Sequence, residues 1–188
     1  MNEKMRVLET KEKKGLTITD LILVGILLAA GAVLKFFVGS VINVGGMKPN
    51  FIIAMYCLAV LIIRPKITEA VIIGLLSGII CQFFPGTPYI NIISELFGAA
   101  SMALLIRLPL NIGKFNLRPI AGTFISTLIS VFIYLGILYL ALYSGFDVKP
   151  TGLIPFLGVI FGTAAINSII VQILYVPVSA AVKKQVNV

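Results

Sequence analysis

Most of the sequence consists of apolar runs that are long enough to cross a lipid bilayer and are separated by short polar turns. A helix needs about 20 predominantly apolar residues to span the hydrocarbon core. Hydrophobic residues make up 59% of the chain and charged residues only 12%. The apolar residues do not alternate with polar ones, as they would in a β-barrel or in a soluble amphipathic fold. The chain is therefore predicted to be an all-α integral membrane protein.

Six transmembrane helices are predicted, and they form a single domain over residues 1–188. A charged cytoplasmic arm, residues 1–19, precedes them. The expected spans are about residues 20–39, 50–64, 67–84, 89–108, 119–143 and 153–182. The first span begins like a signal peptide, but its apolar run continues through Phe36 and Phe37, which favours a retained helix.

The distribution of basic residues predicts the topology. With the N-terminus inside and six spans, twelve of the fifteen Lys and Arg residues fall on the cytoplasmic side, all except Lys35, Lys48 and Lys149. This agrees with the positive-inside rule and places both termini in the cytoplasm. The net charge of +8 is thereby explained by topology, and no nucleic-acid partner is expected.

A polar, glycine-rich segment, Asn43 to Asn50, separates the first two apolar runs. Its paired glycines can adopt positive φ angles, and Lys48 adds a cation. The segment is either a solvated turn or a binding loop. The apolar run that follows it, Phe51 to Ile63, is short for a bilayer, which favours a loop that dips toward the membrane or caps a cavity.

Few polar side chains stand inside the apolar runs, and these are the candidate ligand-binding groups. A carboxylate at bilayer depth costs about 2.5–3.5 kcal/mol on insertion scales, so Glu95 is a functional candidate, with a structural pair to Lys48 or Lys35 as the alternative. An amide at mid-membrane, such as that of Asn167, must find a partner. The predicted substrate-binding residues are Gly45, Gly46, Met47, Lys48, Asn50, Tyr56, Gln82, Tyr89, Asn91, Glu95 and Asn167.

Other polar or reactive residues are predicted to be structural. Lys35 is interpreted as an interfacial anchor, with a substrate contact as the alternative. Ser126 and Ser130 belong to a hydroxyl-bearing face that favours helix packing over ligand binding. The spacing of Cys57 and Cys81 matches no metal or redox motif, and the chain has no histidine, so no metal and no cofactor are predicted.

Several segments resemble the substrate-binding S components of energy-coupling factor (ECF) transporters, in particular their tryptophan-transporter branch. The resemblance covers about residues 21–107. It is carried by Gly45-Gly46-Met47-Lys48-Pro49-Asn50, Arg64-Pro65, Gly74 with Gly78, and Phe84-Pro85-Gly86 followed by Ile90-Asn91-Ile92-Ile93. Ser94-Glu95 departs from that branch, in which an Asp-Lys pair follows the Asn-Ile-Ile.

The resemblance implies a subunit of the bacterial plasma membrane that captures a small solute from outside, tryptophan or a close relative. It further implies docking onto a membrane coupling subunit that two ATPase subunits drive. Gly25 and Ala29 take the place of the small-x-x-x-small contact that the family uses for docking. Because the sequence contains no Walker motif, ATP chemistry belongs to the partner chains. A vitamin or vitamin precursor is the alternative substrate.

The residues also suggest how tryptophan would bind. Its carboxylate would meet Lys48 and the glycine loop, and its ammonium group would meet Glu95 or Asn91. The expected ring contacts are Phe51, Tyr56, Phe84 and Tyr89. Two other classes of function remain open. A purely structural subunit would bind no ligand, and an intramembrane enzyme would use Glu95 as a base; no nucleophile–base pair accompanies this residue, so the chain is not predicted to be an enzyme.

Overall fold

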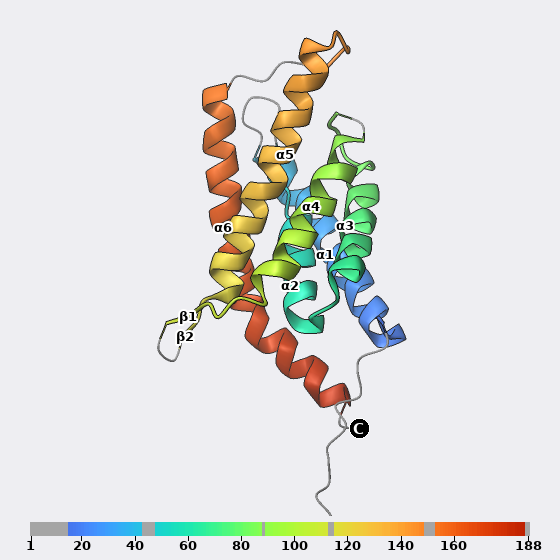
Figure 1. The fold of residues 1–188 in the computed structure, drawn as a ribbon, viewed down its shortest axis with the longest axis vertical. Helices are drawn as coiled ribbons and strands as arrows, with labels where there is room; N and C mark the ends of the chain where they lie inside the picture. The colour runs from blue at the N-terminus through green and yellow to red at the C-terminus, as the bar shows by residue number, and fades with distance from the viewer. Residues whose placement is uncertain (1–14, 43–47, 88, 113–114, 149–152, 187–188) are drawn as a thin grey trace, which may run out of the picture.

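The computed structural model describes residues 15–42, 48–87, 89–112, 115–148 and 153–186. In these residues six α-helices run up and down beside one another (Figure 1). They are α1 (Ile18–Val41), α2 (Ile52–Ile63), α3 (Ile67–Cys81), α4 (Ile90–Leu105), α5 (Thr123–Tyr143) and α6 (Leu153–Val186). A wide helical turn, η1 (Arg118–Gly122), leads into α5.

The prediction of an all-α fold is confirmed, with one small addition. Helix α1, helix α5 together with η1, and helix α6 are long and apolar enough to cross a membrane, whereas α2, α3 and α4 are shorter apolar helices. The element that the sequence did not predict is a short antiparallel hairpin between α4 and η1. Its strands are β1 (Asn111–Ile112) and β2 (Phe115–Asn116).

Helix α2 forms the centre of the bundle. All of its residues except Ile62 are buried, and it contacts each of the other five α-helices. Its 12 residues extend over only about 18 Å, less than the roughly 30 Å of a hydrocarbon core. Of the described non-helical residues before it, Pro49 and Phe51 are buried, and Lys48 and Asn50 are half-buried. The chain therefore enters the bundle before α2 begins, which is allowed at membrane depth where protein surrounds the backbone.

Two glycines let α3 and α4 approach closely. A Cβ built on Gly74 would lie 2.5 Å from the carbonyl oxygen of Glu95, and one built on Gly78 would lie 2.6 Å from the Cα of Ile92. Small residues at such crossings allow membrane helices to pack backbone against backbone. These two glycines therefore serve close helix packing.

Polar contacts fix the ends of the helices. Thr17 and Asp20 form a capping box at the start of α1, as their residue types predicted. In the turn between α2 and α3, the Lys66 amide donates to Oε2 of Glu69 at 2.8 Å. Nη2 of Arg107 donates to the carbonyl oxygen of Pro65 at 3.0 Å, so the end of α4 holds this turn in place.

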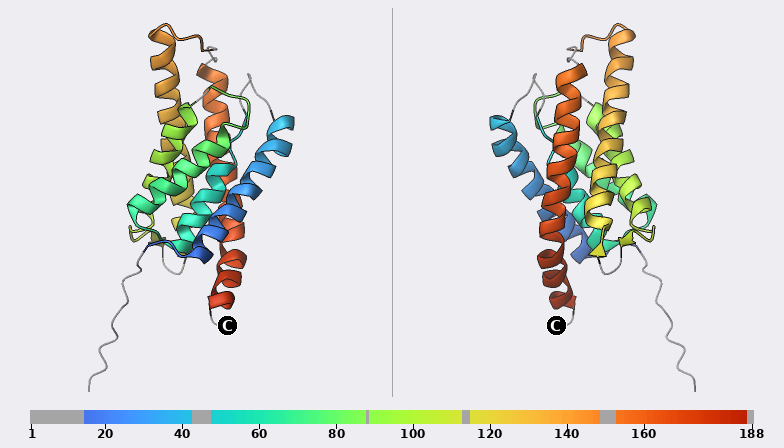
Figure 2. Two further views of the ribbon diagram at one scale, coloured as in Figure 1. Left: turned by 90° about the vertical axis from the view of Figure 1, so that its right-hand side faces the viewer. Right: turned by 90° about the vertical axis from the view of Figure 1, so that its left-hand side faces the viewer.

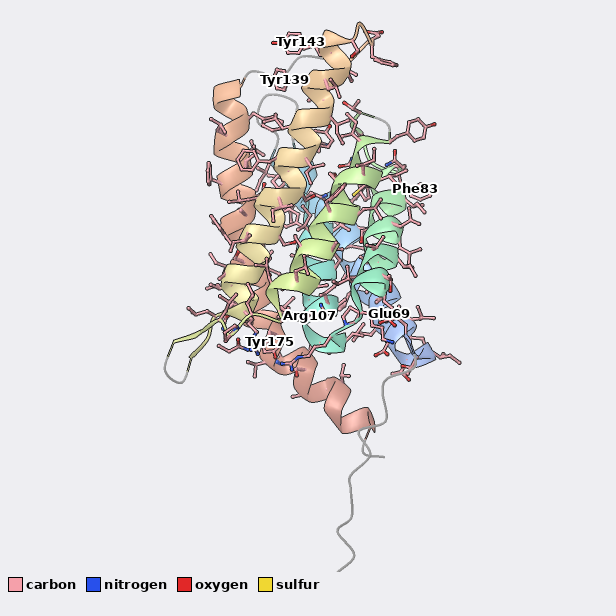
Figure 3. All side chains as sticks on the ribbon, in the orientation of Figure 1. Glu69, Phe83, Arg107, Tyr139, Tyr143 and Tyr175 are labelled. Carbon is pink, nitrogen blue, oxygen red and sulfur yellow. The ribbon has the colours of Figure 1, made fainter. Side chains whose placement is uncertain are left out.

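The ends of the bundle differ in their side chains. Tyr139 and Tyr143 lie at one end, and Glu69, Arg107 and Tyr175 lie toward the other (Figure 3). Helix α1 begins and helix α6 ends at the Arg107 end (Figures 1 and 2). Both ends of the described chain are thus on one side of the bundle, as an even number of antiparallel helices requires.

Helix α6 is the longest element, with 34 residues. The helix continues through Pro177 to Val186. Its last part turns across the lower end of the bundle in Figure 1. A proline removes one backbone hydrogen bond and favours a bend at such a place.

Candidate ligand-binding site

The carboxylate of Glu95 lies at the centre of a polar cluster inside the apolar bundle. Glu95 belongs to α4 and is only 1% exposed. Nδ2 of Asn50 donates to Oε1 at 2.6 Å, and Oγ of Ser130, on α5, donates to Oε2 at 3.0 Å. Each carboxylate oxygen therefore has a hydrogen-bond donor, as a buried charge requires.

Asn50 connects this carboxylate to a third helix. It follows Pro49 and precedes the first turn of α2, so its own carbonyl oxygen is not used within that helix. Nδ2 of Asn167, on α6, donates to this oxygen at 3.1 Å. The end of the loop between α1 and α2 is thus bound to α4 through its side chain and to α6 through its backbone.

A buried lysine lies at the other side of the cluster. Lys35 of α1 is 8% exposed, and its Nζ donates to Sγ of Cys81 at 3.4 Å and lies 5.1 Å from the ring centroid of Phe84. Sγ of Cys81 is in turn 3.7 Å from Nδ2 of Asn50. The interpretation of Lys35 as an interfacial anchor is wrong, because the ammonium group points into the bundle. Lys35 and Glu95 are connected through Cys81 and Asn50.

Two buried polar atoms next to the cluster have no hydrogen-bond partner within the described residues. They are Oη of Tyr56 and Oδ1 of Asn167, both on side chains that are 0% exposed. The phenol of Tyr56 fits beside α4 because position 98 is a glycine, where a Cβ would collide with Oη. Leaving a buried polar atom unpaired costs about 1–3 kcal/mol, and Oη of Tyr56 lies close to the Glu95 carboxylate and the Ser126 hydroxyl.

An apolar pocket of about 400 Å³ lies beside this region. It is lined by Ile42, Pro49, Gly158, Val159, Gly162, Thr163 and Ile166, from the end of α1, the loop end and the first half of α6. Its volume is within the range of small-molecule sites. A Cβ built on Gly158 or on Gly162 would meet no atom within 4 Å.

The structure brings together four of the predicted substrate-binding residues: Asn50, Tyr56, Glu95 and Asn167. Gly45, Gly46 and Met47 lie outside the described residues. Lys48 is half-buried, and its Cβ would lie 3.6 Å from a Cβ built on Gly39.

The other three predicted residues lie around the turn between α3 and α4. Gln82 is engaged locally: its Nε2 donates to the carbonyl oxygen of Gly78, and its Oε1 accepts from the amide of Tyr89. The side chain of Tyr89 is 73% exposed. Nδ2 of Asn91 would lie 4.0 Å from a Cβ built on Gly86 in the same turn. Their predicted contacts with substrate stay predictions.

A family model for the tryptophan transporter TrpP matches residues 17–183, nearly the whole chain. The chain belongs to the tryptophan transporter TrpP family. The match confirms the resemblance to the tryptophan branch of the S components and extends it past residue 107. No curated protein and no solved structure matched the chain in the other two comparisons.

Three further residues take part in the cluster: Cys81 and Ser130, which the sequence analysis missed, and Lys35, for which a contact with substrate or with Glu95 was only the alternative. Each had been assigned an anchoring or packing role. For Ser130 the sequence signal was its place on the hydroxyl-bearing face of α5. On that face Ser126 does serve helix packing, because its hydroxyl donates to the carbonyl oxygen of Gly98 at 2.8 Å.

The residues predicted to dock the family member onto its partner lie on an open face. Gly25 and Ala29 are both exposed on α1, and a Cβ built on Gly25 would meet no atom within 4 Å. Gly31, by contrast, faces α2, where a Cβ would lie 2.9 Å from the Cα of Ile52. Helix α1 thus uses one small residue for packing inside the bundle and leaves two others uncovered.

Proposed function

We propose that this chain is the substrate-binding S component of an ECF-type importer and that it captures tryptophan for ATP-driven uptake by partner subunits. The observation that carries the proposal is the Glu95 cluster, in which a buried carboxylate and a buried ammonium group lie inside an apolar bundle. The tryptophan transporter family match supports the choice of substrate.

The two charges suit an amino-acid zwitterion. Ionisable groups inside a membrane bundle are costly, and they are retained where they bind a substrate or pair with one another. In the described residues Lys35 and Glu95 are bridged by an amide and a thiol instead of meeting directly. The ammonium group of tryptophan would replace the Asn50 amide at Glu95, and its carboxylate would replace the thiol of Cys81 at Lys35.

The chain is proposed to cross the plasma membrane of a bacterium six times, with both termini in the cytoplasm. The positive-inside rule supports this orientation, since the basic turns around Arg64, Arg107 and Arg118 lie at the end of the bundle where α1 begins. The site would then lie in the half of the bundle that faces outward, where the loop between α1 and α2 returns to it.

Energy is proposed to come from partner chains, namely a membrane coupling subunit and two ATPases. The sequence has no nucleotide-binding motif, and the exposed Gly25–Ala29 face of α1 is the proposed contact with the coupling subunit. No enzymatic role is proposed, because the family that the chain matches is one of transporters.

A binding experiment on the purified full chain tests this function. Isothermal titration in lipid nanodiscs with tryptophan, other amino acids and vitamins should show binding of tryptophan. Thermal unfolding should show that tryptophan stabilises the chain. The ligand should be recovered unchanged. Binding of a vitamin in place of tryptophan would support the alternative substrate, conversion of the ligand would indicate an enzyme, and the absence of any binding would leave only a structural role.

A further inference from the structure

The apolar pocket and the polar cluster adjoin each other through two pairs of residues. Pro49 lines the pocket, and its neighbour Asn50 bonds Glu95. Thr163 lines the pocket, and Asn167 lies one turn further along α6 on the same side of the helix. Asn50 and Asn167 are themselves joined by a hydrogen bond of 3.1 Å. A ligand that reaches Glu95 from the pocket would therefore pass beside Asn167.

The amide of Asn167 is only half satisfied. Its Nδ2 donates to the carbonyl oxygen of Asn50, while its Oδ1 has no partner in the part of the chain that the structure describes, and the side chain is 0% exposed. A buried acceptor in this state is stabilised by any ligand that brings a donor. The free atom accepts and does not donate, so it selects for an N–H or O–H group.

On the basis of the function proposed above, we propose that the pocket holds the indole ring of tryptophan and that Oδ1 of Asn167 accepts the indole N–H. The indole nitrogen is a donor only, which matches an orphaned acceptor. The glycines at positions 158 and 162 leave one wall of the pocket free of side chains, so a flat ring can lie against the α6 backbone.

This arrangement accounts for selectivity among aromatic amino acids. A phenylalanine ring fills the apolar pocket but leaves Oδ1 of Asn167 unpaired. A site that hydrogen-bonds one substrate group discriminates strongly against an analogue that lacks it, because the group in the protein then stays buried without a partner. We expect the loss of the N–H to weaken binding by about 10- to 100-fold, which corresponds to about 1.4–2.8 kcal/mol.

The test uses tryptophan and its benzothienyl analogue, in which sulfur replaces the indole N–H with little change of shape. Titration of the full wild-type chain in nanodiscs should show the analogue binding about 10- to 100-fold more weakly. In the Asn167→Leu variant, tryptophan should weaken to the level of the analogue while the analogue is nearly unaffected. Equal weakening of both ligands by this substitution would overturn the assignment and leave Asn167 with only its bond to Asn50.

A second variant tests the pocket if Asn167→Leu does not fold. A Cβ built on Gly158 meets no atom within 4 Å, so Gly158→Leu should fold, place its side chain in the pocket and lose most tryptophan binding. Gly136→Leu on α5 is the matched control, because that exposed glycine is equally open and lies away from the pocket. Unchanged tryptophan binding in Gly158→Leu would refute the ring site. Failure of the wild-type chain to bind tryptophan at all would instead refute the proposed function.

Discussion

Nδ2 of Asn50 donates a 2.6 Å hydrogen bond to Oε1 of Glu95, and this bond joins the end of the first loop to the first half of α4. The two residues are 45 positions apart in the sequence. Because Asn50 lies at the point where the chain enters the bundle, any ligand that takes its place at Glu95 also changes how the loop is held. Ligand binding and the position of the loop between α1 and α2 are thus physically connected.

The Asn50–Glu95 bond should contribute measurably to stability. In Asn50→Leu one oxygen of a buried carboxylate loses its donor, which should lower the free energy of unfolding by about 1–3 kcal/mol. Thermal unfolding of the ligand-free chain in nanodiscs measures this. Asn91→Leu replaces a half-buried amide on the same helix as Glu95 and serves as the control. Equal midpoints for Asn50→Leu and the wild type would show that this bond is energetically unimportant.

The crossing of α3 and α4 should not tolerate a side chain at Gly78. A Cβ there would lie 2.6 Å from the Cα of Ile92, which is backbone and cannot rotate away. We expect Gly78→Ala to destabilise the chain by about 1–3 kcal/mol, the usual cost of overpacking. Gly136→Ala, where a Cβ meets nothing within 4 Å, should be neutral or slightly stabilising. Thermal unfolding of the two variants side by side decides this, and similar midpoints would contradict the close packing.

Much of the fold could be read from the sequence because apolar run length and turn residues act locally. Thr17 and Asp20 are residue types that start helices, and they cap α1. Arg64, Pro65 and Lys66 are typical of a turn at the cytoplasmic side, and they lie between α2 and α3. The hairpin β1–β2 was missed because each of its strands has only two residues, too few for any periodic pattern.

The site was predictable only in part, for a different physical reason. An isolated carboxylate or amide within an apolar run is conspicuous, so Glu95 and Asn167 were found. The direction in which a long side chain points could not be predicted. Lys35 near the end of a span can reach either the interface or the interior, and the choice depends on Cys81 at the end of α3 and Phe84 in the turn that follows. Such partners are set by tertiary packing and leave no trace at neighbouring sequence positions.

The topology predicts opposite accessibility at the two ends of the bundle. Cysteines placed at Lys11 or Asn116 should resist an impermeant thiol reagent in intact cells, because both positions are assigned to the cytoplasm. A cysteine at Asp147, in the exposed segment after α5, should react. The unmodified chain is the background control, since its own Cys57 and Cys81 are buried. Labelling at Lys11 or Asn116 would show that the predicted orientation or the predicted number of spans is wrong.

Coupling to the partner subunits should depend on the open face of α1. Gly25→Leu or Ala29→Leu adds bulk where no other part of the described chain packs on Gly25, so tryptophan binding by the isolated chain should stay near the wild-type value. Uptake of labelled tryptophan in cells that also produce the coupling subunit and ATPases should be abolished, because the partner backbone can no longer approach. Gly136→Leu should retain both activities. Parallel loss of binding and uptake in the α1 variants would assign these residues to the fold of the chain itself.

The final prediction concerns which lysine binds the substrate carboxylate. Sequence spacing favoured Lys48, whereas Lys35 is the buried cation that is connected to Glu95 through Cys81 and Asn50. The charge inside the bundle should matter more, because charge-assisted hydrogen bonds strengthen where water is excluded. We therefore expect Lys35→Met to weaken tryptophan binding by about 10-fold or more while tryptophanamide, which lacks the carboxylate, is little changed.

Three variants and three ligands separate these possibilities. Lys48→Met is the matched control, because it removes the same charge from a half-buried position. Glu95→Gln should weaken the binding of tryptophan more than that of indolepropionate, the analogue without the ammonium group. Titration of each variant with tryptophan, tryptophanamide and indolepropionate gives the full set of comparisons. If Lys48→Met discriminates between acid and amide and Lys35→Met does not, then the loop lysine is the carboxylate partner, as the sequence indicated. If none of the three substitutions discriminates among the ligands, Lys35 and Glu95 stabilise the fold, and the zwitterion site proposed here does not exist.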